Sequence, residues 1–544
     1  MLEQQSPTGA GLDPTSIQVV GNLLHTIANE VEVDLVRAAY SPVIKESFDC
    51  SAAILGPDGA CWAQADAIPL QMGVLGAVLR RLLPFGDSGT RAGDVVITND
   101  PDYGVPHLND FVAIAPVMVD GEAIAYVATL MHHTDVGGMA PGSMPADATE
   151  LYQEGIRIPP RLVARDGDAD SGFIQLMLAN TRMPTNFRGD LEAQLSACAR
   201  GVTRLAESVQ RIGFAKFSEC VEAFLDYTEK LVHHRLRDLR DGDYAAERFV
   251  DGPPLANGDP VKIRAKVRVD GGRITIDYGE SSDQVPRPIN AVLSNGEAAA
   301  VVAVRSFLDM DLNVNDGLDR LVTVNCRSGA VLNPILPAPV GGRAQVSVLA
   351  FECVADCLGD ASPTGAVASS SGGTTMPYTW MPTAGPMAGQ VLVDNSLSGG
   401  MGATSSARGT AATDNSVTNA MNYPAELMEQ EFPLRVERSA VRRDSGGRGR
   451  FAGGDGMIRE IRFLEPGYLS LRGHRHQFPP PGRQGGAAGA PTRFELVRGG
   501  ETIELDPQAS RVATEPGDLF ISRTPGGGGF GDPESAADTK SKED

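Results

Sequence analysis

The stretch from residue 111 to residue 132 restricts the fold of this chain more than any other. Two apolar segments, FVAIAPVMV and AIAYVATLM, lie on either side of Asp120-Gly121. Asp-Gly is a preferred pair for the two-residue turn of a β-hairpin, because both positions of that turn require a positive φ. The segments therefore predict two antiparallel strands within a sheet, and the second strand ends at His132.

The rest of the chain contains both helical and strand patterns. A long helix is predicted near residues 16–38, where apolar residues recur at three- and four-residue spacing on one face. Residues 186–240 predict two more helices, separated by Gly213. Residues 48–63 predict two short strands, and residues 261–279 predict a hairpin. The expected fold class is mixed α/β (α+β), with mixed sheets, long helices and a β-rich C-terminal part.

A chain of 544 residues exceeds the size of one simple hydrophobic core, so several domains are expected. We predict a metal-site domain with an N-terminal helix and a helical hairpin over residues 1–245. A central α/β domain is predicted over residues 246–430 and a β-rich domain over residues 431–533. The charged residues 534–544 are expected to form a disordered tail.

Composition narrows the class of protein. The net charge of −22 and the pI near 4.8 argue against nucleic-acid binding, which depends on clustered Lys and Arg. The seven cysteines form no CxxC pair, so neither a zinc ribbon nor a disulfide framework is expected. No apolar run reaches the roughly 18 residues of a membrane-spanning helix, and no secretory signal pattern is visible. A cytoplasmic enzyme or complex subunit is expected.

Two histidines and two aspartates have the chemistry of a metal site. His107 and Asp110 lie three residues apart in a loop, and His132 ends a predicted strand. Asp49, at the start of another predicted strand, could supply a fourth ligand. Imidazole nitrogen and carboxylate oxygen together suit one divalent transition metal, Zn²⁺, Mn²⁺ or Fe²⁺, and leave a position for water. Hydrogen-bonded loop residues would show the same spacing, because spacing alone cannot show that these segments meet.

The residues after His132 allow two interpretations each. His133 could be a base near the metal or a packed histidine, and spacing alone favours packing. Asp135 could orient a ligand histidine or cap the glycine turn that follows it. The Gly/Pro-rich stretch of residues 137–155 is too apolar for a tail, so an ordered loop that covers part of the protein is expected.

Phosphate-binding motifs are missing from the sequence. It contains no GxxxxGK[ST], and no GxGxxG opens a helix after a strand. The glycine run at residues 526–529 has no helix behind it, so a phosphate cradle is not expected there. Gly341-Gly342-Arg343 could meet an anion, but a tight turn is favoured. If the chain acts on an ATP-activated substrate, another polypeptide binds the ATP.

Residues 365–415, dense in Gly, Ser, Thr and Ala, are expected to be close-packed irregular backbone.

Several long motifs resemble the hydantoinase B family. They are SPVIKESFDCSAAI, GDVVITNDPDYGVPHLNDF, HHTDVGGMAPGSMPADATELYQEGIRIPP, NPILPAPVGG, EFPLRVERSAVRRDSGGRGRFAGGDGMIREIRF and TPGGGGFGDP. The similarity runs from about residue 17 to residue 533. This family includes the β subunits of N-methylhydantoinase and caprolactamase, the C-terminal half of 5-oxoprolinase, and the metal-bearing subunits of acetone and acetophenone carboxylases.

The resemblance implies the β subunit of an ATP-dependent cyclic-amide hydrolase that opens hydantoin, 5-oxoproline or lactam rings. A hydantoinase A-type partner would phosphorylate the substrate with ATP, in an α2β2 or larger hetero-oligomer, and this chain would complete hydrolysis at its metal. The family's metal ligands fall on Asp49, His107, Asp110 and His132. Catalytic assignments fall on His133, Asp135 and Glu150.

Three other functions stay open at this point. One is a subunit of an ATP-dependent ketone carboxylase of the acetone or acetophenone type. The second is a non-catalytic scaffold for the ATP-using subunit, and the third is a stand-alone metallohydrolase that needs no ATP. The chain also departs from the family pattern at Cys50, in KESFDCS, where the family usually reads KERxDFS. A thiol beside Asp49 could bind a soft metal, although its side chain should face the opposite side of a strand.

Overall fold

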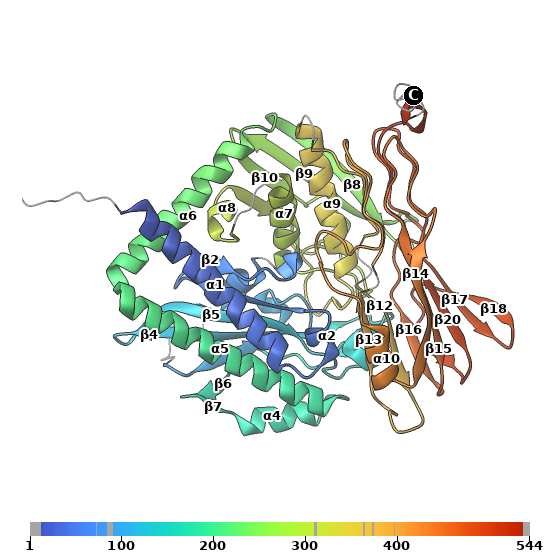
Figure 1. Ribbon diagram of the computed structural model, residues 1–544, viewed down its shortest axis with the longest axis horizontal. Coiled ribbons are helices and arrows are strands. Elements are labelled where there is room, and N and C mark those ends of the chain that lie inside the picture. The colour runs from blue at the N-terminus through green and yellow to red at the C-terminus, as the bar shows by residue number, and fades with distance from the viewer. Residues whose placement is uncertain are drawn as a thin grey trace, which may run out of the picture.

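The computed structural model describes residues 12–536 except 72, 84–90, 309–312, 363–364, 373–374 and 397. Helices α1 to α9 and their sheets form one layered body, and the β-rich C-terminal part lies along its side (Figure 1). The predicted tail at 534–544 lies outside the described residues from 537 onward, and Pro533–Ala536 forms a short 3-10 helix. In the described residues, no helix combines the length and apolar character needed to cross a membrane.

The first sheet contains the predicted hairpin at its centre. Its seven strands have the order β2-β1-β5-β4-β3-β6-β7. Asp120 and Gly121, between β4 and β5, have φ values of 52° and 86°, as a turn with two positive φ angles requires. The prediction of a hairpin ending at His132 is confirmed. The strands are β1 Cys50–Leu55, β2 Cys61–Gln64, β3 Val95–Thr98, β4 Asp110–Val119, β5 Glu122–His132, β6 Arg161–Arg165 and β7 Asp168–Ala169.

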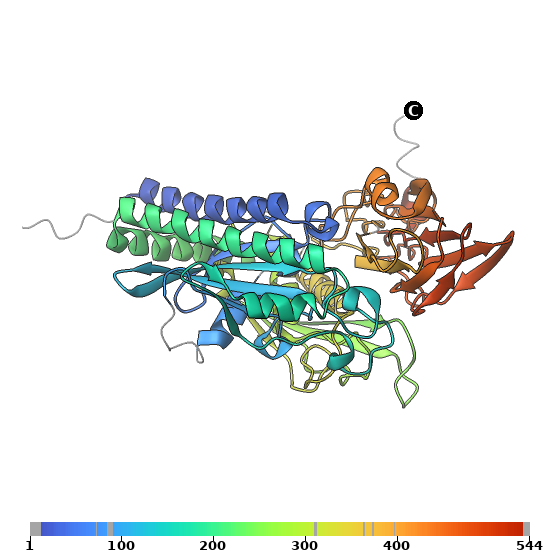
Figure 2. The same cartoon turned by 90° about the horizontal axis from the view of Figure 1, so that it is seen from below.

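Three long helices cover one face of this sheet, side by side in Figure 2. They are α1 Pro14–Ala38, α5 Pro184–Ile212 and α6 Phe214–Leu236. Asp13 caps α1 by accepting hydrogen bonds from the amides of Thr15 and Ser16, which satisfies donors that a helix start leaves free. Gly213 has a φ of 88° and ends one helix before the next begins. The three predicted helices are therefore confirmed.

The same part of the chain contains several short helices. They are α2 Pro42–Lys45, α3 Val74–Leu82, α4 Ser171–Leu178 and the 3-10 helices η1 Pro69–Gln71, η3 Pro101–Tyr103, η4 Pro141–Ser143 and η5 Leu151–Gln153. Two of the 3-10 helices, η4 and η5, lie in the Gly/Pro-rich stretch, which is an ordered loop as expected.

The second sheet has four strands in the order β11-β10-β9-β8. Helices α7 and α9 share a buried apolar cluster with it, so the helices and the sheet form one core. The predicted hairpin at residues 261–279 is confirmed as β9 and β10. The elements are β8 Gly242–Val250, β9 Val261–Asp270, β10 Arg273–Asp277, α7 Leu293–Phe307, α8 Asp316–Asp319, β11 Val322–Asn325 and α9 Ala344–Ala361.

Two further sheets form the C-terminal part, with strand orders β13-β12-β16-β19 and β14-β15-β20-β17-β18. Trp380 stacks on Phe463 at 4.8 Å between ring centroids, in an aromatic core shared by both sheets. The first of these sheets joins strands on both sides of residue 430, and the domain boundaries stay predictions. The elements are β12 Thr375–Pro382, β13 Leu392–Ser396, α10 Ala425–Glu431, β14 Leu434–Arg442, β15 Gly456–Phe463, β16 Gly467–Leu471, β17 Arg493–Arg498, β18 Glu501–Leu505, β19 Val512–Thr514 and β20 Leu519–Arg523.

Glycine segments far apart in the sequence pack backbone against backbone beside these sheets. The Gly527 amide donates to the Gly454 carbonyl oxygen at 2.9 Å, and the Gly454 amide donates to the Met401 carbonyl oxygen at 2.8 Å. All four amides of residues 526–529 donate to carbonyl oxygens of the chain. The glycine run therefore occupies the centre of an interlocked backbone layer and has no amide available for a phosphate.

Candidate metal centre

The β4–β5 hairpin brings two of the predicted ligands together. Asp110 is the first residue of β4, His132 is the last residue of β5, and the two are paired in the strand register. Residues opposite each other in an antiparallel pair lie about 4.5–5.5 Å apart. The Asp110 amide donates to the His107 carbonyl oxygen at 3.0 Å, which closes a turn that returns His107 to the strand end.

The side chains of His107, Asp110 and His132 form a compact, fully buried group. Nδ1 of His107 lies 2.9 Å from Oδ2 of Asp110, and Nδ1 of His132 lies 3.4 Å from Oδ1 of the same carboxylate. The two imidazole centroids are 4.9 Å apart. One ligand atom from each residue lies within 4.8 Å of the others, a spacing that could hold one metal ion.

The polar atoms of this group fit a metal. Both ring nitrogens of His107 and of His132, and Oδ1 of Asp110, are shielded from solvent and have no partner with hydrogen-bond geometry in the described part of the chain. An unsatisfied buried polar atom costs about 1–3 kcal/mol, so leaving several in one place would be strongly destabilising. A divalent cation satisfies imidazole nitrogen and carboxylate oxygen together.

The charge states of these residues also suit ligation. Burial, followed by the charge of Arg343, lowers the pKa of His107 to about 3. Burial alone would raise the pKa of Asp110, but the charges of His107 and Arg343 outweigh it and hold that pKa well below its usual range. At neutral pH the His107 imidazole is therefore neutral and the carboxylate is ionised, the forms that bind metal.

Asp49 lies beside this group. Its Oδ2 is 3.9 Å from Nδ1 of His132, and Gln71 donates to its Oδ1 at 3.0 Å. The pairing of β1 with β5 holds it there, and its role as a fourth ligand stays a prediction. Cys50 is buried in the apolar cluster that includes α1, and burial raises the pKa of its thiol well above the usual value. The thiol is thus a core group rather than a thiolate.

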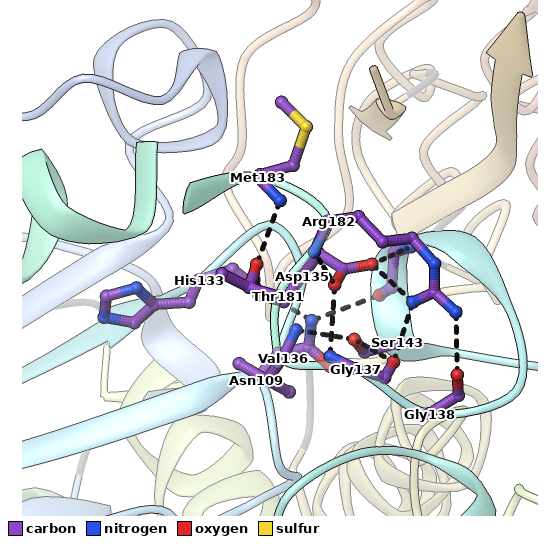
Figure 3. A network of polar contacts seen from close by, with 11 residues as sticks. Asn109, His133, Asp135, Val136, Gly137, Gly138, Ser143, Thr181, Arg182 and Met183 are labelled. Atoms are coloured by element: carbon purple, nitrogen blue, oxygen red, sulfur yellow. Dashed lines mark hydrogen bonds and ion pairs between the residues drawn. The ribbon is translucent and has the colours of Figure 1, made fainter. Parts of the chain in front are cut away.

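His133 is a packed histidine in this structure. Its ring lies 4.5 Å from that of Phe111 and 4.6 Å from that of Phe187, centroid to centroid. Burial, followed by the charge of His132, lowers the pKa of His133 to about 3. The ring points away from Asp135 and Arg182 in Figure 3. These contacts match the packing interpretation, and a catalytic role for His133 stays a prediction.

Asp135 holds the Gly/Pro-rich loop in place (Figure 3). Its carboxylate accepts hydrogen bonds from the amides of Gly137, Gly142 and Arg182 at 3.1, 3.0 and 2.9 Å, and from Nη1 of Arg182 at 2.9 Å. The Arg182 guanidinium also donates to the carbonyl oxygens of Gly137 and Gly138. These are the contacts of a residue that caps the glycine turn.

Replacing Asp135 by Asn is expected to lower the free energy of unfolding by about 2–4 kcal/mol. The amide accepts through one oxygen only, and it leaves the Arg182 guanidinium without its counter-charge. Urea unfolding of the purified chain measures this change. Asp238→Asn, at an exposed position, is the control and should change stability by less than about 0.5 kcal/mol. Lost activity with unchanged stability would instead support the catalytic assignment of Asp135.

Glu150 is exposed and is the N-cap residue of η5. Its side chain accepts from the backbone of Gln153, whose side chain in turn contacts the Glu150 amide. These reciprocal bonds form a capping box. The catalytic assignment of Glu150 therefore rests on the family resemblance and stays a prediction.

Sequence reasoning missed two charged residues, Arg343 beside the group and Glu154 near Arg343. Nη2 of Arg343 donates to Oδ2 of Asp110 at 3.0 Å across 233 positions. The buried Glu154 carboxylate accepts from the amides of Val340 and Gly341 at 3.0 and 2.8 Å, and burial raises its pKa to about 7. The Gly341-Gly342-Arg343 segment was the feature of the sequence that could have indicated both residues, because it was noted as a possible anion contact. The anions that this segment contacts are the carboxylates of Asp110 and Glu154, so it is more than a tight turn.

Comparisons with known proteins agree with this architecture. The Hydantoinase B/oxoprolinase family matches residues 13–533. The chain is 29% identical over 541 residues to the caprolactamase subunit β of Pseudomonas jessenii, covering 96% of this chain and 91% of that one. The solved ATP-dependent caprolactamase from P. jessenii is similar over 98% of this chain and 94% of that chain, with 27% identity and a TM-score of 0.90. An acetone carboxylase structure shares the fold, with 17% identity, a TM-score of 0.84 and coverage of 97% and 78%.

Proposed function

Because the chain belongs to the hydantoinase B/oxoprolinase family, we propose that it is the metal-binding β subunit of an ATP-dependent cyclic-amide hydrolase with a separate ATP-using subunit. The observation that carries the proposal is the buried group of His107, Asp110 and His132, in which neither Nε2 atom has a hydrogen-bond partner in the described part of the chain. The similar caprolactamase is described as ATP-dependent, and its matching chain is named a subunit. Both descriptions support a partner that uses the ATP, in a hetero-oligomer.

The residues that would hold the metal are His107, Asp110 and His132, with Asp49 as the fourth. A bound Zn²⁺, Mn²⁺ or Fe²⁺ would supply Lewis-acid polarisation and a water of lowered pKa. Asp110 is the central residue, since both histidines and Arg343 contact its two oxygens. Arg343 orients that carboxylate through Oδ2, as partners of metal ligands commonly do.

Arg343 also places a positive charge beside the group. Its side chain is 11% exposed, and charge interactions strengthen where water is excluded. In the proposed reaction the partner phosphorylates the amide oxygen, water adds to the activated carbon, and the carbon–nitrogen bond breaks as the nitrogen takes up a proton. A second water then hydrolyses the resulting acyl phosphate to a carboxylate and phosphate. Negative charge grows on oxygen during the addition, and a fixed guanidinium nearby stabilises that charge.

The test is coupled turnover by the reconstituted complex. This chain is purified with a hydantoinase A-type subunit and offered hydantoin, 5-oxoproline, 2-pyrrolidinone and caprolactam with ATP. We expect ring opening of at least one of them, with ADP formed in proportion to product, and no product from this chain alone.

Each competing function gives a different result in the same assay. If product forms only from a ketone and bicarbonate, the chain is a subunit of a carboxylase and the proposed hydrolase function is wrong. If this chain alone opens a ring without ATP, the reaction needs no ATP-using partner and the chain is a stand-alone hydrolase. If a complex that contains the His107→Ala/Asp110→Ala variant keeps full activity, the metal group is not needed for the reaction, and the scaffold function is favoured over the hydrolase.

A further inference from the structure

The turn before α9 brings Arg343 to the metal group. Residues 340–343 form this turn, because the Arg343 amide donates to the Val340 carbonyl oxygen at 3.0 Å. Helix α9 begins directly after it. The Arg343 side chain extends from the end of the turn, and its Nη2 donates to Oδ2 of Asp110 at 3.0 Å. The position of the turn therefore decides where the guanidinium meets the carboxylate.

Glu154 binds the beginning of the same turn. Its Oε2 accepts from the Val340 amide at 3.0 Å, and its Oε1 accepts from the Gly341 amide at 2.8 Å. The residue is 1% exposed, so water does not compete for these two bonds. Two parallel hydrogen bonds to one carboxylate fix direction as well as position. Glu154 and Arg343 thus hold the two ends of one short backbone segment.

Close backbone packing leaves the Glu154 carboxylate little room to move alone. A Cβ built at Gly341 would lie 3.0 Å from Oε1 of Glu154. On the other side, a Cβ built at Gly138 would lie 2.6 Å from the Glu154 carbonyl carbon. Glycine at both positions allows this approach. A displacement of Glu154 would therefore displace the turn that carries Arg343.

Three parts of the chain meet at Glu154. The residue lies near the end of the Gly/Pro-rich stretch, the turn precedes α9, and Arg472 directly follows β16 of the C-terminal part. Burial raises the pKa of Glu154 to about 7, and the two bonds from the turn oppose this shift, as do the charges of Arg472 and Arg343. The C-terminal part thus adds a positive charge to this junction.

We propose that Glu154 is a positioning residue for the metal group: Glu154 fixes the turn, and the turn fixes Arg343 against the Asp110 carboxylate. This inference rests on the proposed function and adds to it the residue that sets the geometry of the central ligand. The bonds of the Glu154 carboxylate go to the turn, so its influence on the metal group passes through Arg343. A residue that only satisfied two buried amides would affect stability and leave metal binding unchanged.

The test measures the metal affinity of the purified apo chain, with Zn²⁺, Mn²⁺ and Fe²⁺ each titrated in competition with a chelator. Glu154→Gln removes one of the two acceptor oxygens. It should weaken binding of the preferred ion about ten- to hundredfold, as the loss of a partner of a metal ligand does. Glu154→Asp keeps both oxygens at a shorter reach and should lose less affinity. If Glu154→Gln does not fold, Glu154→Asp decides the question, and wild-type affinity in the variant that folds would contradict the inference.

A double-mutant cycle shows whether the effect passes through Arg343. Arg343→Met should also weaken metal binding, because it removes the partner of Asp110. In the Arg343→Met background, Glu154→Gln should change the affinity by less than about twofold, since two residues that act in series do not add. An equal loss of affinity in both backgrounds would show that Glu154 acts independently of Arg343, and the inference would be wrong.

Asp251→Asn is the matched control. The buried Asp251 carboxylate accepts from the amides of residues 476–478 at 2.9, 3.1 and 2.9 Å. Asp251→Asn and Glu154→Gln should both lower the urea midpoint, because each leaves a buried amide without its acceptor. Only Glu154→Gln should weaken metal binding. Equal weakening in the two variants would reflect a general loss of folding and would also count against the inference.

The failure of this inference differs from the failure of the proposed function. If the wild-type chain binds metal and the complex opens a ring, but Glu154→Gln keeps the wild-type affinity, the inference is wrong and the proposed function stands. If the wild-type chain binds none of the three ions, the proposed function is wrong and this inference is wrong with it.

Discussion

The variant His107→Ala is expected to lose the bound metal and to lower ring opening by about 10³-fold or more. His107, Asp110 and His132 each offer one ligand atom within 4.8 Å of the others, so removing one imidazole leaves only two of these three ligands. The partner subunit should still bind ATP, because it is a separate chain in the proposed complex. Asp110→Asn should give a similar loss, since Asp110 contacts both histidines and Arg343.

Metal content is measured by mass spectrometry on purified wild-type and variant chains, and product is measured with the partner and ATP. About one equivalent of metal is expected in the wild type, as in a single His/carboxylate site. His234→Ala, exposed on α6, should keep both metal and activity. Equal metal content in wild type and His107→Ala would place the ion elsewhere. If neither the wild type nor the variant contains metal, even after reconstitution, the metallohydrolase mechanism is wrong.

Gly527→Ala is expected to destabilise the protein by at least about 3 kcal/mol. A Cβ built at Gly527 would lie 2.0 Å from the carbonyl oxygen and 2.3 Å from the carbonyl carbon of Met401. These are backbone atoms, so no side-chain rotation can make room. The Gly527 amide also donates to Gly454, and that bond would be strained when the two segments separate.

Urea unfolding and soluble yield measure the Gly527→Ala effect against Gly296→Ala. Gly296 lies in α7, and the atom nearest to a Cβ there is 3.7 Å away, an ordinary contact. Alanine at that helical position should be neutral or stabilise by up to about 1 kcal/mol. Similar stability changes for the two variants would show that the glycine layer tolerates side chains and that its packing is looser than the structure indicates.

The elements that could be predicted before the structure was known are those built from local sequence patterns. Helix α1, the β4–β5 hairpin and the break at Gly213 follow from apolar spacing and turn chemistry within short windows. Three of the four predicted metal ligands come from the same local region. His107 and Asp110 are three residues apart, and the β4–β5 hairpin pairs Asp110 with His132 after a one-residue register shift between Val117 and Met118.

Contacts between segments that are distant in the sequence became visible only in the folded chain. Arg343 reaches Asp110 across 233 positions, Glu154 accepts from the amides of Val340 and Gly341, and Gly527 packs against Met401. These neighbours depend on how whole sheets and helices stack, and a contact between stacked layers leaves no periodic pattern in either segment. Local patterns predict an element because its energetics are local, whereas the packing of layers is settled by the sum of many weak contacts over the entire chain.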